Sequence, residues 1–179
     1  ALLSLVSLGL IFVVLYSRYQ SVSLALIIMA NVPLALIGSV AALWIAGHSF
    51  SVASAIGFIT LAGIATRNGI LKISHYINLV LFEGETFGRK MIIRGTLERL
   101  TPVLMTALSA SIALVPLMIG AGEPGKEILS PVAVTIFGGL ISATLLDAFL
   151  TPVLFLLLGR KPLENLASAK GDNAHAEAF

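Results

Sequence analysis

The sequence has 179 residues, of which 58% are hydrophobic and 11% are charged, and its mean hydropathy is +1.02. A soluble domain usually carries about 25% charged residues, so this composition excludes an ordinary soluble fold. The net charge of +2 is too small to indicate a nucleic-acid partner, and the absence of cysteine excludes disulfides and thiolate metal sites.

Apolar runs of about twenty residues predict membrane-spanning helices, because that length crosses the hydrocarbon layer at ~1.5 Å per residue. The sequence therefore predicts an all-α integral membrane protein, a bundle of about five transmembrane helices. The expected spans cover residues 1–16, 22–46, 51–82, 102–119 and 131–158. We expect the first span to be truncated, since the chain begins inside an apolar run. Arg18 follows that run, whereas a signal peptide has its basic residues first.

The connection over residues 85–100 is the longest between two spans and has a mixed pattern. Phe87 and Met91 recur at helical spacing, with charged residues at the positions between the apolar ones. This pattern predicts an amphipathic helix on the inner membrane surface that joins two spans. We expect the bundle to occupy residues 1–163 and residues 164–179, rich in alanine, asparagine and charge, to form a disordered tail.

The basic residues indicate the orientation of the chain. If the first span runs inward, eight basic residues lie on the cytoplasmic side and only Lys126 lies outside. The cytoplasmic ones are Arg18, Arg89, Lys90, Arg94, Arg99, Arg160, Lys161 and Lys170. The positive-inside rule then predicts a cytoplasmic C-terminus.

Two cations and one amide lie close together within the third expected span, in the stretch Gly63–Lys72, which is otherwise mostly apolar. They are Arg67, Lys72 and Asn68. Charged side chains in hydrocarbon are costly and usually face a bundle interior or a water-filled path. A long arginine can also reach the inner headgroups, so a structural role for Arg67 stays open.

Asp147 is the only acidic residue within any expected span. Because an unpaired carboxylate is costly there, our hypothesis is that it faces Arg67 or Lys72 across a helix interface. A static pair and a part in proton transfer both remain open. Thr106, near the start of the fourth span, can bond its own helix backbone or join a polar chain with Arg67 and Asn68.

The residue types of metal and enzyme sites are dispersed in this chain. Its four methionines and three histidines have no second ligand at helical spacing, which predicts packing roles and no metal site. No nucleophile motif, phosphate loop or pair of carboxylates is present, so we expect neither hydrolytic chemistry nor a cofactor.

Three stretches together carry a family resemblance. They are Gly57–Leu71 (GFITLAGIATRNGIL), Arg99–Thr106 (RLTPVLMT) and Gly122–Glu127 (GEPGKE), the last followed by Pro131–Val134 (PVAV) and Gly138–Leu140 (GGL). These stretches resemble the resistance-nodulation-division (RND) permeases, particularly the heavy-metal efflux branch of the CusA/CzcA type. The resemblance covers residues 1 to about 163, and the spans would be the eighth to twelfth of a twelve-helix permease.

The resemblance implies a secondary active transporter rather than an enzyme. Inward proton flow would drive the export of heavy-metal cations by proton antiport. It also implies a homotrimer in the bacterial inner membrane, joined to a periplasmic adaptor (membrane fusion) protein and an outer-membrane channel. A multidrug RND permease and a non-transporting membrane scaffold are the alternatives.

The resemblance also suggests site residues. The position of Arg67 carries a charged or polar member of the family's proton relay, Thr106 matches a relay threonine, and the principal relay acids belong to a span absent here. Our proton-relay candidates are Arg67, Asn68, Thr106, Asp147 and Lys72. Monovalent copper and silver pumps have an acidic residue in place of Arg67 and a lysine in place of Val103, which argues against those two metals. Zinc, cobalt and nickel stay open.

Overall fold

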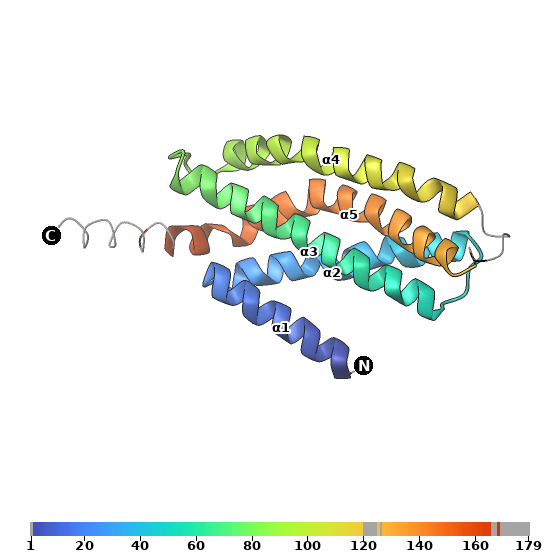
Figure 1. Ribbon diagram of the computed structural model, residues 1–179. Helices are drawn as coiled ribbons and strands as arrows, with labels where there is room; N and C mark the ends of the chain where they lie inside the picture. The colour runs from blue at the N-terminus through green and yellow to red at the C-terminus, as the bar shows by residue number, and fades with distance from the viewer. Residues whose placement is uncertain (1, 120–124, 126, 166–167, 169–179) are drawn as a thin grey trace.

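The computed structural model describes residues 2–119, 125, 127–165 and 168 (Figure 1). Its helices are α1 (Leu2–Tyr19), α2 (Val22–Ile45), α3 (Val52–Leu81), α4 (Arg89–Ile119) and α5 (Leu129–Leu158), and a short helical segment follows over 160–165. No strand occurs in the described residues, which agrees with the predicted all-α fold. Most of the tail expected over 164–179 lies outside the described residues. The same holds for Lys126, Lys170 and the motif residues 122–124.

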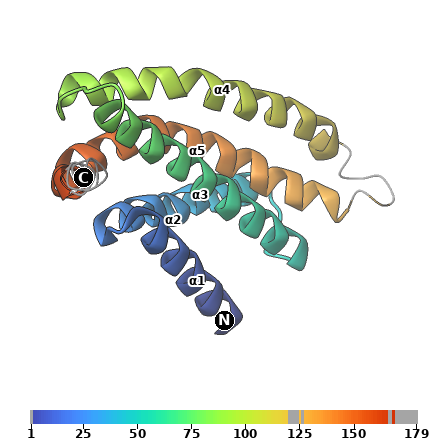
Figure 2. The same ribbon diagram turned by 60° about the vertical axis from the view of Figure 1, so that its left-hand side comes forward.

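Helix α5 lies at the centre of the bundle and contacts α2, α3 and α4 (Figures 1 and 2). Figure 2 shows α1 leaning away from the other helices, with its N-terminal end far from α5. Among the described residues, α2, α3, α4 and α5 are long and apolar enough to cross a membrane. The apolar stretch Gly9–Tyr19 of α1 is shorter. Large apolar side chains such as Trp44, 84% exposed, cover the outside, as expected for a surface that faces lipid.

The structure differs from the sequence-based expectation at α4. We expect an amphipathic helix over 85–100 and a separate span over 102–119, but one helix runs unbroken from Arg89 to Ile119. Pro102 therefore lies inside the helix and not in its first turn. A proline removes one backbone hydrogen bond, and neighbouring helices make this tolerable in a membrane helix. The predicted break before Pro102 is wrong.

Contacts with α3 explain why the first turns of α4 stay in line with the rest. Met91 and Gly95 are buried there, and the hydroxyl groups of Thr96 and Tyr76 lie 2.6 Å apart. A Cβ atom on Gly95 would lie 2.8 Å from both Tyr76 Cδ1 and Leu79 Cδ1, so glycine permits this close approach. The first turns of α4 are thus held against α3.

Small residues let α2 and α5 approach closely. A Cβ atom on Gly138 would lie 2.1 Å from Ala42 Cβ, and one on Gly38 would lie 2.1 Å from Ser142 Cβ. The hydroxyl of Ser39 also donates to a backbone carbonyl of α5 at 2.8 Å. In lipid, helices associate through such close packing and interhelical hydrogen bonds, so this contact holds the centre of the bundle together.

Replacing Gly138 by alanine should force α2 and α5 apart. We expect the free energy of unfolding to fall by about 1–3 kcal/mol, the usual cost of overpacking. Thermal unfolding of the full-length protein in detergent measures the change. Gly63→Ala is the matched control, because its added Cβ meets no atom within 4 Å. Equal unfolding midpoints for the two variants would contradict the close contact.

Candidate functional site

A buried ion pair joins α3 to α5. Lys72 Nζ lies 2.7 Å from Asp147 Oδ2, and the two side chains are only 2% and 7% exposed. Lys72 also donates a hydrogen bond to the backbone carbonyl of Asp147. Of the two partners that we expected for Asp147, the structure places Lys72 beside it, and not Arg67.

The other carboxylate oxygen of Asp147 faces Thr151, one helical turn further along α5. The Thr151 hydroxyl lies 3.1 Å from Asp147 Oδ1 and 3.2 Å from Asn31 Oδ1 on α2. Since a hydroxyl has one proton, it donates to one of these oxygens at a time. All four side chains are buried, so α2, α3 and α5 meet at a single polar cluster.

The energetics of this cluster favour keeping both charges together. Removing two charges from water is expensive, and their attraction compensates only when the geometry is good and the remaining polar atoms are hydrogen-bonded. Here the Asp147 carboxylate meets Lys72 on one oxygen and Thr151 on the other. Loss of one partner would leave the other charge buried without compensation. The pair therefore ties α3 to α5 whether or not a proton ever moves.

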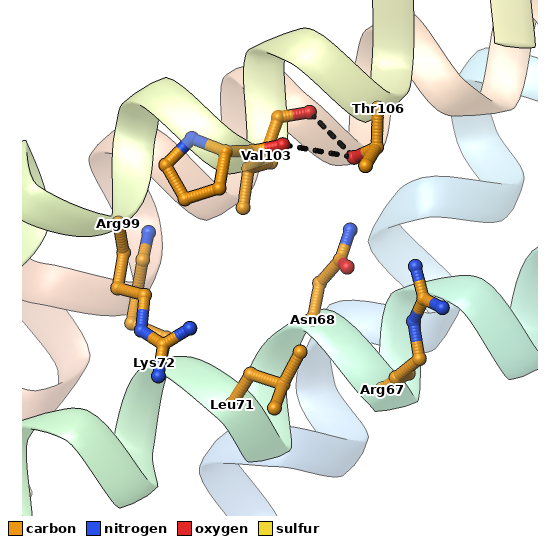
Figure 3. A pocket seen from close by; sticks show the side chains of 8 residues that line it. Arg67, Asn68, Leu71, Lys72, Arg99, Val103 and Thr106 are labelled. Carbon is orange, nitrogen blue, oxygen red and sulfur yellow. Dashed lines mark hydrogen bonds between the residues drawn. The ribbon is translucent and has the colours of Figure 1, made fainter.

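A cavity of about 90 Å³ lies between α3 and α4, beside the ion pair (Figure 3). Figure 3 shows Arg67 and Asn68 extending from α3 toward α4, where Thr106 lies. The lining residues are Arg67, Asn68, Leu71, Lys72, Arg99, Pro102, Val103 and Thr106. The structure thus brings four of the five relay candidates to one cavity, and Lys72 connects it to the fifth, Asp147.

Among the described residues, Arg67, Asn68 and Thr106 have no side-chain hydrogen bond to another helix. The Thr106 hydroxyl bonds its own helix, at 2.9 Å from the Val103 carbonyl and 3.1 Å from the Pro102 carbonyl. Arg67 is exposed and has no ion pair or hydrogen bond among the described residues. In a membrane, an arginine so placed needs water or another polar group beside it.

Three residues of the site escape our sequence analysis. Arg99 is named there for topology and as the start of a family-like stretch but not as a site residue, yet it lines the cavity with Arg67. Asn31 and Thr151 are not considered at all. Two features of the sequence could have found them: Asn31 is an amide in the middle of an apolar span, and Thr151 follows Asp147 at helical spacing.

The chemistry of the cluster suits a proton better than a metal ion. Its one carboxylate already has a lysine partner, which leaves no net negative charge to attract a cation. The described residues contain no group of three His, Cys, Asp or Glu side chains that could hold a metal. This geometry allows two roles for Asp147. Its carboxylate can exchange a proton, or it can form a static ion pair that links the helices.

Known proteins resemble the chain over most of its length. The profile of the AcrB/AcrD/AcrF family matches residues 1–159. Cobalt-zinc-cadmium resistance protein CzcA of Cupriavidus metallidurans is 40% identical over 156 residues, which is 87% of this chain and 14% of CzcA. Nickel and cobalt resistance protein CnrA of the same species is 42% identical over 140 residues, 78% of this chain and 13% of CnrA.

A solved structure of a heavy metal efflux pump is also similar to this chain. An X-ray crystal structure of a heavy metal efflux pump, crystal form II, superposes with a TM-score of 0.73 at 38% identity. The match covers 86% of this chain and 15% of the pump. The chain therefore spans about one seventh of the length of the proteins that it matches.

Removing one member of the ion pair should destabilise the bundle more than removing both. We expect Lys72→Met to lower the free energy of unfolding by about 3–5 kcal/mol, because Asp147 is left buried and unpaired. The double variant Lys72→Met/Asp147→Leu should recover most of that loss. Unfolding of the full-length protein and its variants in detergent gives the coupling energy. Additive losses in the double variant would contradict the pairing.

Proposed function

Because this chain belongs to the AcrB/AcrD/AcrF family, we propose that it is part of the membrane region of a proton-driven RND pump that exports heavy-metal cations. Proteins of this family are transporters and not enzymes. The observation that carries the proposal is the Lys72–Asp147 pair, buried among apolar helices beside a cavity lined by further cations. Ionisable groups at such positions usually mark a substrate path or a proton relay.

The proposed relay uses Asp147 as the group that takes up a proton. Protonation would cancel the charge of the carboxylate and free Lys72 from its partner. Since Lys72 also lines the cavity, the change of charge would be felt by Arg67, Asn68 and Thr106. A pump of this kind has two conformations, and the proton would favour the one in which Lys72 has turned from Asp147.

We propose divalent cations as the substrates. The names of CzcA and CnrA mention cobalt, zinc, cadmium and nickel. Arg67 and Val103 stand where monovalent copper and silver pumps are expected to have an acidic residue and a lysine, which favours the divalent group. The five relay candidates would act on protons, and the cation would be bound elsewhere in the full-length pump.

We further propose the assembly and orientation that the family resemblance implies. The pump would be a homotrimer in the bacterial inner membrane, with a periplasmic adaptor protein and an outer-membrane channel as partners. The C-terminus would be cytoplasmic, in agreement with the distribution of basic residues. The great length of the relatives leaves room for the periplasmic domains that such an assembly needs.

Resistance of a pump-deleted strain that carries the full-length gene tests the substrate class and Arg67 together. We expect resistance to cobalt, zinc, nickel and cadmium, and none to copper, silver or drugs. Arg67→Ala should reduce resistance to the level of the deleted strain, whereas Arg67→Lys keeps the charge and should retain part of it. Arg89→Ala, which removes an exposed cation outside the cavity, is the control at equal expression.

The outcomes of this assay separate the alternatives. Resistance to drugs alone would move the protein to the multidrug branch. An absence of all resistance in the wild type would favour a non-transporting scaffold. Full resistance with Arg67→Ala would remove Arg67 from the relay and leave it a structural role at the headgroups.

Asp147→Asn distinguishes a proton-binding carboxylate from a static tie. Asparagine keeps the shape, so its amide oxygen can accept a hydrogen bond from Lys72 and its amide nitrogen can donate one to the Thr151 hydroxyl, but it cannot take up a proton at neutral pH. We expect metal transport driven by a pH gradient in proteoliposomes to fall to the level without a gradient. Gel filtration and thermal unfolding verify that the variant is folded. Unchanged transport with an unchanged pH dependence would leave Asp147 only the static role.

A further inference from the structure

One buried polar atom of the described bundle has no hydrogen-bond partner there. It is Nδ2 of Asn31, on a side chain that is 6% exposed. The other end of the amide already lies 3.2 Å from the Thr151 hydroxyl. Buried amide groups are nearly always hydrogen-bonded, either to protein or to an ordered water. The free end of Asn31 therefore indicates a ligand.

A small cavity lies beside this amide, at the junction of α2, α3 and α5. Its volume is about 10 Å³, which is space for one water molecule. It is lined by Asn31, Ala65, Asn68, Ala143, Leu146 and Asp147. A buried water requires roughly two to four polar partners, and this lining offers one from each of the three helices.

We propose that this cavity is a binding site for a single structural water. The water accepts a hydrogen bond from Asn31 and donates one to the carboxylate of Asp147. The carboxylate has acceptor capacity left, because only Lys72 and Thr151 occupy its oxygens with side-chain contacts. A metal cation would gain little here, since Lys72 already neutralises the only acidic group in the lining.

Asn68 connects the proposed water site to the larger cavity between α3 and α4. It lines the small cavity and also the cavity of about 90 Å³ that contains Arg67 and Thr106. A water between Asp147 and Asn68 therefore gives the carboxylate a second hydrogen-bonded connection to the larger cavity, besides the direct contact with Lys72. This connection rests on the proposed relay, whereas the water site itself does not.

Glycine at position 69 makes room for the arrangement. A Cβ atom there would lie 3.2 Å from Asn31 Nδ2 and 3.3 Å from Ile28 Cγ2. The absence of a side chain lets α3 come close to α2 at the level of the amide. Asn31 thus lies near enough to Asn68 and Asp147 for all three to line one water-sized space.

Electron cryo-microscopy of the full-length pump, at a resolution that shows buried waters, tests the site. We expect a density peak within hydrogen-bonding distance of the Asn31 amide and the Asp147 carboxylate. Asn31→Leu should abolish the peak, because it removes a partner and fills the space. Ala65→Val should also abolish the peak, because it fills the cavity from its apolar side. This second variant tests the site if Asn31→Leu does not fold.

Ser39→Ala is the matched control for these variants. Ser39 is a buried polar residue on the same helix, bonded to the Thr135 carbonyl, and it does not line this cavity. The peak should persist in this variant. A wild-type map without a peak, or one in which a protein group fills the space, would overturn the water site.

Gradient-driven metal transport of the same variants tests the connection to the relay. Asn31→Leu should reduce transport several-fold at an unchanged unfolding midpoint, while Ser39→Ala should not. If Asp147→Asn abolishes transport and Asn31→Leu does not alter it, the water is bound but lies off the proton route. If Asp147→Asn has no effect, the proposed relay fails, and the density peak still decides the water site independently.

Discussion

The buried charge of Asp147 is the constraint on which the described bundle depends. A carboxylate among apolar helices must have a cation at contact distance, so α3 must bring Lys72 to α5. That contact requires close helix packing, which small residues provide. A Cβ atom on Gly139 would lie 2.1 Å from Leu61 Cδ2, and Ala143 is buried one turn further along. Electrostatics and steric fit thus select the same arrangement of the two helices.

The sequence predicts the helices and the need for a cation opposite Asp147, but the choice of cation depends on how α3 is rotated. Arg67 and Lys72 are five residues apart and point about 140° from each other on a helix. Lys72 shares its face with Asn68 and Ala65, at spacings of four and seven residues, and this face is buried. The small residues near Lys72 on α3, Ala65 and Gly69, are the feature of the sequence that favours Lys72 over Arg67.

The single helix α4 could not be predicted from its own residues. Pro102 after a charged segment resembles the start of a helix, because proline is favoured in the first turn. Continuity depends on contacts that Gly95 makes with Tyr76 and Leu79, and these are 16 to 19 residues earlier in the chain. The local pattern therefore does not show that the helix begins at Arg89 and continues through Pro102.

The cavity between α3 and α4 carries an excess of positive charge. Arg67, Lys72 and Arg99 line it, and the lining includes no acidic residue. The charge of Asp147 is already compensated by Lys72, so it cannot also balance the two arginines. Cations at this density inside a membrane require anionic partners or water. Arg67 is exposed and has no ion pair or hydrogen bond among the described residues, so we propose that a carboxylate from another span of the full-length pump pairs with it.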